Sequence, residues 1–135
     1  MAGADKITEP AIAALVTRFY GKARRDPTIG PLFEQAVGDW DAHMSKLCDF
    51  WSSVMLTSGR YKGNPMAAHI KQSKIEPAFF ERWLALWHET AGEVFAPAAA
   101  AQFDLKAERI AESLKLALFY RPGAIPIVRA GAATA

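Results

Sequence analysis

The amino-acid sequence predicts an all-α protein, and three observations lead to this fold class. Apolar residues recur at steps of three and four along most of the 135 residues, which is the spacing of one helix face. Alternating segments rich in β-branched residues and bounded by hairpin turns are missing. Pro27, Gly38 and Pro97 fall where one periodic stretch ends and another begins. We therefore expect a bundle of helices without a sheet.

Length and composition predict one domain of the ordinary soluble type. A chain of 135 residues, 51% hydrophobic and 22% charged, is long enough to bury a sizeable core. The net charge is only +2, and the short basic cluster of Lys22, Arg24 and Arg25 is typical of a solvated helix end, so we expect no nucleic-acid partner. Cys48 is the only cysteine, which excludes an intramolecular disulfide. Signal-peptide and membrane-spanning patterns are missing, and we expect a cytoplasmic protein that binds no membrane.

The first two predicted helices precede Gly38. Thr8 is expected to cap a helix that runs to about residue 25, with Glu9 and Pro10 in its first turn. A short helix or turn follows over residues 28–37. The apolar residues of these two elements are Ile12, Leu15, Val16, Phe19 and Tyr20 in the first, and Ile29, Leu32, Phe33 and Ala36 in the second.

A long third helix is expected from the cap residue Asp39 to about residue 57. Residues 58–65 are predicted to form a loop, and a short helix over residues 66–72 carries His69. The predicted buried stripe of the long helix consists of Trp40, His43, Leu47, Phe50, Trp51, Val54 and Met55.

Two more long helices complete the prediction. One covers about residues 76–95, and the other starts at Pro97 and reaches about residue 120. Residues 121–135 hold two prolines, two glycines and many alanines and are predicted to be a disordered tail, so the domain spans residues 1–120. The apolar faces consist of Phe79, Phe80, Trp83, Leu84, Trp87 and Ala91 in the first helix, and Phe103, Leu105, Ile110, Leu114 and Leu118 in the second.

His69 is the most informative single residue of the chain. The segment that holds it is too short to add much core, and an imidazole is one of the few side chains that ligate iron. Tyr20, His43 and Trp83 lie on otherwise apolar faces of three different helices, and buried polar groups need partners. They could converge on one small polar ligand in a dry pocket. The alternative is that the aromatic stripes are ordinary core and that each polar group bonds a nearby backbone carbonyl.

A series of short motifs runs from about residue 12 to residue 87. The motifs are Phe19-Tyr20, Asp26 with Ile29-Gly30-Pro31-Leu32-Phe33, Trp40-x-x-His43, Phe50-Trp51, Tyr61-x-Gly63-x-Pro65-Met66-x-x-His69 and Phe79-Phe80-x-x-Trp83-Leu84. Each motif alone is weak, but in this order and at this spacing they resemble the group III truncated haemoglobins, a family of small bacterial globins. The Gly-Gly turns typical of the other truncated-haemoglobin groups are absent, which supports the third group.

The resemblance implies a truncated globin fold, a two-over-two helical sandwich around a non-covalent protohaem (haem b). His69 matches the family's axial iron ligand. Tyr20, His43 and Trp83 match its polar residues on the opposite, distal side of the haem. Phe33 matches the aromatic residue that packs against the haem before the long middle helix.

The family pattern and helix-face spacing together predict the other contacts of the haem. Lys62, Lys71 and Arg82 are candidate partners of the haem propionates, or else plain surface charges. The residues expected to bind the cofactor are Phe33, Phe50, Trp51, Val54, Met55, Tyr61, Met66, Phe79, Phe80 and Leu114.

The implied function is reversible binding of dioxygen, carbon monoxide, nitric oxide or cyanide at a five-coordinate iron with a polar distal pocket. Residues 64–72 contain no acidic side chain that could pull the ring proton of His69, which argues against a dedicated peroxidase. Nitric-oxide dioxygenation or weak peroxidase activity with a separate reductase is the alternative. His43 could gate the pocket, bond the ligand or ligate iron. A haem-free helical interaction module is the alternative from another class, and it would be colourless rather than red.

Overall fold

Helices dominate the computed structural model of the chain, which describes residues 3–64 and 75–119. The described helices are α1 (Glu9–Ala23), α2 (Gly30–Ala36), α3 (Trp40–Leu56), α5 (Pro77–Val94) and α6 (Pro97–Phe119). The described residues form no strand, and their β-type pairing is limited to an isolated bridge between Ala4 and Phe95. The prediction of an all-α fold is therefore confirmed. The predicted short helix over residues 66–72 and the predicted tail over residues 121–135 lie outside the described residues.

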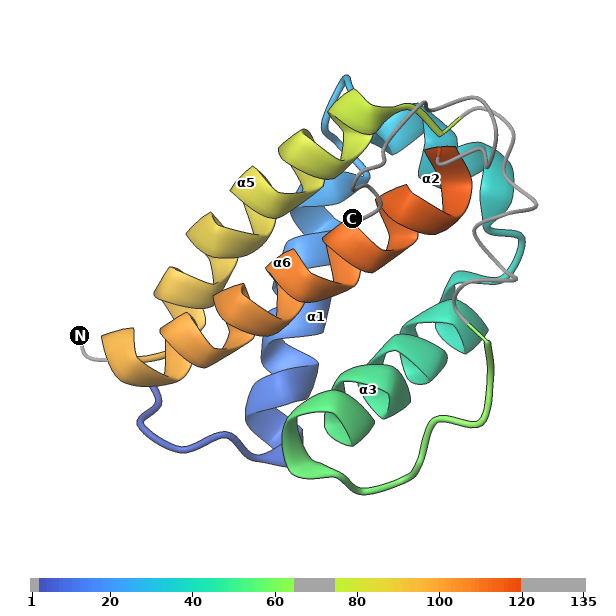
Figure 1. Ribbon diagram of the computed structural model, residues 1–135. Coiled ribbons are helices and arrows are strands. Elements are labelled where there is room, and N and C mark those ends of the chain that lie inside the picture. Colours follow the sequence, from blue (N-terminus) through green and yellow to red (C-terminus); the bar gives the residue numbers. More distant parts are fainter. Residues whose placement is uncertain (1–2, 65–74, 120–135) are drawn as a thin grey trace, which may run out of the picture.

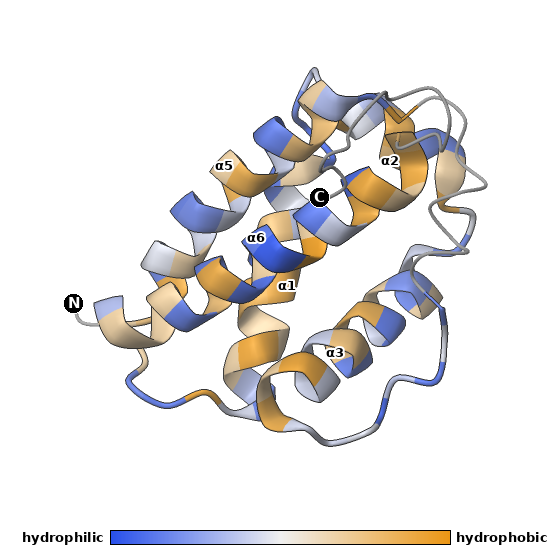
Figure 2. Cartoon of the chain, in the orientation of Figure 1, coloured by the Kyte–Doolittle hydropathy of each residue, from blue (hydrophilic) through white to orange (hydrophobic). Residues whose placement is uncertain are grey.

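The helices pack as two pairs. α5 lies beside α6, and α1 contacts both α5 and α3. Figure 1 shows α5 and α6 running side by side, with α1 crossing behind them and α3 beside the end of α1. The predicted two-over-two sandwich is therefore observed. In Figure 2, each long helix carries both hydrophobic and hydrophilic residues, as expected for helices that bury one face and expose the other.

Short polar side chains fix where the helices begin, as the sequence predicts. The Thr8 hydroxyl accepts a hydrogen bond of 3.3 Å from the backbone N–H of Ala11 at the start of α1. The Asp39 carboxylate accepts one of 3.1 Å from Ala42 at the start of α3. α3 ends at Thr57, whose φ of 52° turns the chain out of the helix.

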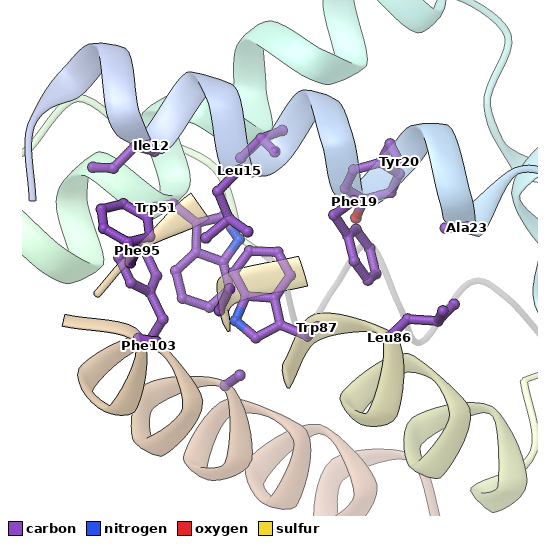
Figure 3. Close-up of a cluster of buried hydrophobic side chains, with 14 of the residues drawn as sticks. Ile12, Leu15, Phe19, Tyr20, Ala23, Trp51, Leu86, Trp87, Phe95 and Phe103 are labelled. Carbon is purple, nitrogen blue, oxygen red and sulfur yellow. The ribbon is translucent and has the colours of Figure 1, made fainter. Parts of the chain in front are cut away.

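The core is built on a stack of indole rings. Trp51 of α3 and Trp87 of α5 stack with their ring centroids 4.4 Å apart, and Phe19 of α1 meets Trp87 edge-on at 5.0 Å (Figure 3). Aromatic pairs of this kind stabilise a fold beyond the area that they bury. The predicted apolar face of α1 is confirmed in full, since Ile12, Leu15, Val16, Phe19 and Tyr20 are all buried.

The predicted apolar face of α6 is wrong at Leu105, which is 47% exposed. Leu105 lies two residues after the fully buried Phe103, which places it roughly 200° around the helix and thus on the solvent side. Small residues supply most of the face that packs instead: Ala99, Ala100, Phe103, Ala107, Ala111 and Leu114 are buried. Alanine is only weakly hydrophobic, so the sequence pattern assigned the more hydrophobic Leu105 to the buried face instead.

The predicted buried stripe of α3 is only partly buried. Trp51 is buried, but its other members, Trp40, His43, Leu47, Phe50, Val54 and Met55, are half-exposed. The residues share one helix face as predicted, but much of that face is turned to a cavity rather than to packed side chains. An apolar helix face left partly uncovered is the first structural sign of a binding site.

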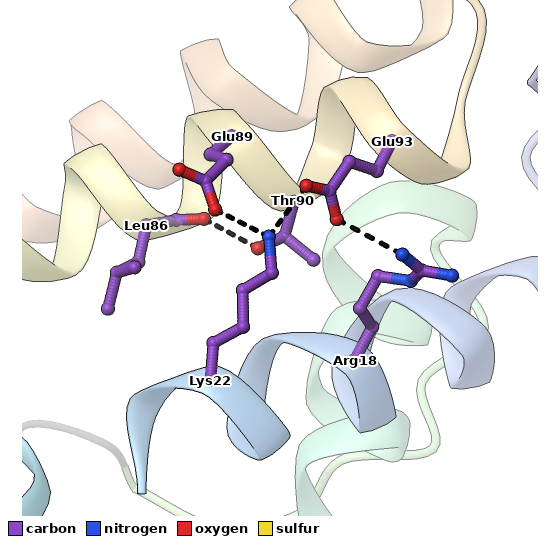
Figure 4. Close-up of polar contacts among 6 residues, drawn as sticks. All are labelled: Arg18, Lys22, Leu86, Glu89, Thr90 and Glu93. Atoms are coloured by element: carbon purple, nitrogen blue, oxygen red, sulfur yellow. Dashed lines mark hydrogen bonds and ion pairs between the residues drawn. The ribbon is translucent and has the colours of Figure 1, made fainter. Parts of the chain in front are cut away.

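Ion pairs join α1 to α5 along the outer edge of their interface. Arg18 and Lys22 of α1 reach Glu93 and Glu89 of α5 at distances between 2.6 and 3.2 Å (Figure 4). Solvent-exposed pairs of this kind contribute little to stability one by one, but they favour one register of the two helices. None of the described helices has the length and apolar character needed to cross a membrane.

Candidate functional site

A cavity of about 910 Å³ opens between the two helix pairs. Pockets of this size hold large organic ligands and are walled mostly by apolar side chains, with a few polar groups that fix orientation. Its walls come from α1, α2, α3, α5, α6 and the loop after α3. The apolar and aromatic members are Ile29, Leu32, Phe33, Ala36, Val37, Ala42, Leu47, Phe50, Trp51, Ile75, Phe79, Phe80, Ile110, Ala111 and Leu114, and the polar ones include Tyr20, His43, Tyr61 and Trp83.

Three polar side chains that the sequence singled out meet at this cavity. Tyr20, His43 and Trp83, from α1, α3 and α5, all line it. The rings of Tyr20 and His43 meet edge-on with centroids 5.8 Å apart. The Trp83 indole approaches the Tyr20 hydroxyl closely enough to lower its pKa, and because an indole N–H can only donate, the tyrosine oxygen faces it as an acceptor. The structure thus brings the three predicted distal residues together.

The environment of Tyr20 keeps its hydroxyl protonated. Burial raises the pKa of Tyr20 far above its ordinary range, and the nearby Trp83 indole opposes this shift only in part. An indole N–H cannot accept the hydroxyl proton, so this proton is available to another acceptor. Tyr20 is therefore a neutral donor at the cavity wall, suited to a small ligand that carries negative charge.

Most of the predicted apolar contacts also lie at the cavity. Val54 and Met55 do not line it and pack instead against the buried core. Met66 and His69 lie outside the described residues. The predicted cofactor-binding residues that line the cavity are Phe33, Phe50, Trp51, Tyr61, Phe79, Phe80 and Leu114.

Hydrogen bonds to α3 hold the loop that closes one side of the cavity. The hydroxyl of Ser53 accepts a bond of 2.9 Å from the backbone N–H of Tyr61, whose ring meets Phe50 edge-on at 5.2 Å. The buried Ser52 hydroxyl bonds both Glu9 of α1 and Ser58, each at 2.6 Å. These contacts give Tyr61 a defined place at the cavity wall.

Cations at the cavity wall differ in part from those predicted. Lys62 lines the cavity as expected, Lys71 lies outside the described residues, and Arg82 is not part of the wall. Sequence reasoning missed Lys46 and Arg60, which also line the cavity. Lys46 follows His43 by three residues on α3, and this i,i+3 spacing was the available signal.

The corner between α1 and α2 is fixed by a buried carboxylate. Asp26 Oδ2 accepts hydrogen bonds from the backbone N–H of Thr28 at 2.9 Å and of Ile29 at 3.1 Å. Its Oδ1 accepts one from Arg82 Nε at 2.7 Å. Burial alone would raise the pKa of Asp26, but the bond from Arg82 and the two backbone N–H groups lower it below its ordinary value. The corner thereby places Ile29 at the cavity.

Comparison with known proteins relates this architecture to globins. A scan against models of protein families finds no match. The chain is 35% identical over 95 residues to the group 3 truncated hemoglobin ctb of Campylobacter jejuni, an alignment that covers 67% of this chain and 75% of the relative. The crystal structure of the group III truncated hemoglobin from Campylobacter jejuni superposes with a TM-score of 0.83 at 30% identity, covering 87% of this chain and 96% of that one.

Sequence and fold therefore agree on one family. The relative found by sequence and the one found by structure belong to the same family, and they cover 67% and 87% of this chain. The chain belongs to the group III truncated haemoglobins.

Proposed function

We propose that this protein holds a non-covalent protohaem in the cavity, with His69 as the axial iron ligand, and reversibly binds dioxygen and other diatomic ligands beside Tyr20 and Trp83. The observation that carries the proposal is the cavity of about 910 Å³, which combines apolar walls with two hydrogen-bonding side chains held against each other. Family membership supports it as well.

The residues at the cavity fit a haem. The ring is flat and apolar, and Phe50, Phe79 and Phe80 offer aromatic surface from two helices. The half-exposed face of α3 would be covered by such a group. Two propionates need cations near solvent, and Lys46, Arg60 and Lys62 line the cavity wall. Asn64 and Ile75, the described residues on either side of the segment that contains His69, line the cavity too, which supports the proposed ligation.

Haem would supply an iron that coordinates small diatomic molecules at a position left open by the protein. The chain's own residues would then decide how firmly such a ligand is held. The Tyr20 hydroxyl donates to a partially negative ligand, and the Trp83 indole beside it offers a second N–H donor. Dioxygen gains more from these donors than the less polar carbon monoxide does. We therefore propose slow dioxygen release.

His43 completes the polar side of the proposed site. Its ring lies edge-on between Tyr20 and Trp40, with centroids 5.8 and 5.5 Å away. Because Tyr20 and Trp83 already supply hydrogen bonds, we assign His43 the role of a gate or a secondary partner of the ligand. Leaving the iron five-coordinate in the absence of ligand is part of this proposal.

Nitric-oxide dioxygenation is the alternative activity, and it would use the same polar pair. The reaction needs a ligand site that stabilises negative charge, which Tyr20 and Trp83 provide, and a separate reductase to restore the ferrous state. Nitrate yield under turnover with nitric oxide and a reductase distinguishes catalysis from storage, since storage yields no more than one nitrate per protein.

The test of haem binding is the colour of the purified protein. A Soret band is expected in the wild type and is expected to be lost in His69→Ala. His88→Ala serves as the matched control, because His88 lies within ion-pairing distance of Asp104 and Glu108 of α6 instead of lining the cavity. A colourless wild-type protein after haem addition would refute the proposal.

The test of the polar pair is the dioxygen dissociation rate. Removal of one hydrogen bond to a charged acceptor costs about 1.5–3 kcal/mol, so Tyr20→Phe is expected to accelerate release by roughly 10- to 150-fold. Trp83→Leu is expected to accelerate it as well, because the indole N–H donor beside Tyr20 is lost. Carbon monoxide release serves as the internal control and should change less. Unchanged dioxygen release in both variants would remove Tyr20 and Trp83 from the proposed site.

A further inference from the structure

The approach of the Trp83 indole to the Tyr20 hydroxyl at the cavity wall depends on the register of α1 against α5. The two residues lie on different helices, and hydrogen-bond strength falls steeply with small changes in distance and angle. A shift of one helix along the other would separate the indole N–H from the tyrosine oxygen. A contact that fixes this register next to Trp83 therefore bears directly on the geometry of the cavity's polar side.

Three sets of ion pairs join α1 and the corner after it to α5, and one of them includes a buried carboxylate. Arg18 and Lys22 bond Glu93 and Glu89 at the exposed edge, with every side chain at least 22% exposed. The ion pair between Asp26 and Arg82 differs, because the Asp26 side chain is only 4% exposed while Arg82 reaches it from the surface. Water screens the exposed ion pairs strongly and the pair between Asp26 and Arg82 much less.

The ion pair between Asp26 and Arg82 is also the one nearest in sequence to Tyr20 and Trp83. Arg82 directly precedes Trp83 on α5, and Asp26 follows Tyr20 by six residues at the corner after α1. The Asp26 carboxylate is fixed by two backbone N–H groups, so it cannot follow Arg82 if α5 moves. Neither Asp26 nor Arg82 lines the cavity, and any effect on a ligand has to pass through Trp83 and Tyr20.

We propose that Asp26 and Arg82 are positioning residues that hold the Trp83 indole beside the Tyr20 hydroxyl and thereby set the ligand release rate. The ligand part of this inference rests on the proposed haem function. The positioning part concerns the chain alone and can be observed without a ligand.

The experiment compares Arg82→Met with Lys22→Met in the full chain. Both variants replace a cationic, ion-pairing side chain by an apolar one, but only Arg82 contacts the buried carboxylate of Asp26. The indole N–H resonance of Trp83 is recorded by ¹⁵N NMR in the haem-free protein and in the ferrous carbon-monoxide form, with Trp83→Phe to assign the signal. Dioxygen dissociation is measured by stopped flow.

Arg82→Met is expected to move the Trp83 signal towards that of an unbonded indole and to accelerate dioxygen release by about two- to tenfold, the range that corresponds to loss of an ordinary hydrogen bond. Lys22→Met is expected to leave the signal unchanged and the rate within about twofold. Arg82→Lys keeps a cation without the planar fork, and it should restore both readouts in part.

Two results would overturn the inference. In the first, Arg82→Met leaves the Trp83 signal at its wild-type position. In the second, Lys22→Met moves it equally, so that Asp26 and Arg82 act only as general stabilisers. Because the signal is also read in haem-free protein, these results are separate from a failure of the wild type to take up haem, which would refute the proposed function instead.

Discussion

At the scale of single residues, the polar groups of the cavity show how neighbours define chemistry. Burial raises the pKa of the Tyr20 hydroxyl, and the Trp83 indole lies close enough to oppose this shift in part. The sequence could place Tyr20, His43 and Trp83 on apolar helix faces, because helical spacing is a local property. It could not predict that Trp83 approaches Tyr20, which depends on how two helices separated by more than 50 residues pack together.

Asp26 gives a prediction for the pH dependence of stability. Its pKa is lowered from the ordinary value of 3.8, so its contribution to stability is present above about pH 4 and is lost as the pH falls through the lower folded-state value. At pH 7, Asp26→Asn is expected to lower the free energy of unfolding by about 1–2 kcal/mol, since Arg82 is partly exposed.

The measurement is urea unfolding of both proteins at pH 7 and at pH 3. The difference between wild type and Asp26→Asn should shrink at the lower pH, because the unfolded wild type takes up a proton at Asp26 below the ordinary pKa of 3.8 while all other groups titrate alike in the two proteins. A difference that stays constant or grows at pH 3 would contradict the assigned ion pair.

His43 gives a spectroscopic prediction. If it serves as a gate or secondary partner, the ferric protein should show a high-spin absorption spectrum, and His43→Leu should change ligand entry rates more than it changes that spectrum. The control is His88→Leu, which alters a histidine that bonds carboxylates of α6. A low-spin bis-imidazole spectrum that disappears in His43→Leu would show that His43 ligates the iron.

At the scale of helices, capping was predictable and packing of small residues was not. Thr8 and Asp39 were identified as caps because a short polar side chain before an apolar repeat bonds the first backbone N–H groups of a helix. Leu105 was assigned to the wrong face, because the buried side of α6 consists largely of alanines. Alanine allows close approach of helices, but it occurs on exposed and on buried helix faces alike, so the spacing of alanines does not show which face is buried.

The start of α2 gives a prediction about close backbone approach. A Cβ added at Gly30 would lie 2.6 Å from the carbonyl oxygen of Arg24 and 3.1 Å from that of Ala23. Gly30→Ala is therefore expected to destabilise the protein by about 1–3 kcal/mol, since backbone atoms cannot move aside as a flexible side chain can.

Gly21 is the matched control in the interior of α1, where an added Cβ meets no atom within 4 Å. Gly21→Ala is expected to raise the free energy of unfolding by about 0.5–1 kcal/mol through better helix propensity. Thermal unfolding of the two variants should therefore give melting temperatures on opposite sides of the wild type. Equal effects of the same sign would refute the close approach of α2 to the end of α1.

At the scale of the whole molecule, the cavity dominates the expected behaviour. A cavity of about 910 Å³ leaves apolar surface of α3 and α5 available to a ligand. A ligand that fills this space binds the folded chain and not the unfolded one, and it stabilises the fold by mass action.

Haem titration is therefore expected to raise the melting temperature in steps with occupancy. At a haem concentration about a thousandfold above the dissociation constant, the gain is about 4 kcal/mol, which corresponds to a shift on the order of 10 °C for a chain of this size. Differential scanning calorimetry during stepwise haem addition provides the measurement. His69→Ala should show a smaller shift, and an equal shift would indicate that His69 contributes nothing to the affinity for haem.

The sequence by itself determined the all-α fold, the order and approximate ends of the described helices, and the polar residues that stand out on apolar faces, because each follows from spacing and capping within a few turns of chain. Only the tertiary structure decided that the apolar face of α3 is turned to a cavity, that Lys46 and Arg60 share its wall, and that Asp26 joins Arg82. These features depend on contacts between residues far apart in the chain, and the free energy of such contacts is set by how the helices pack together.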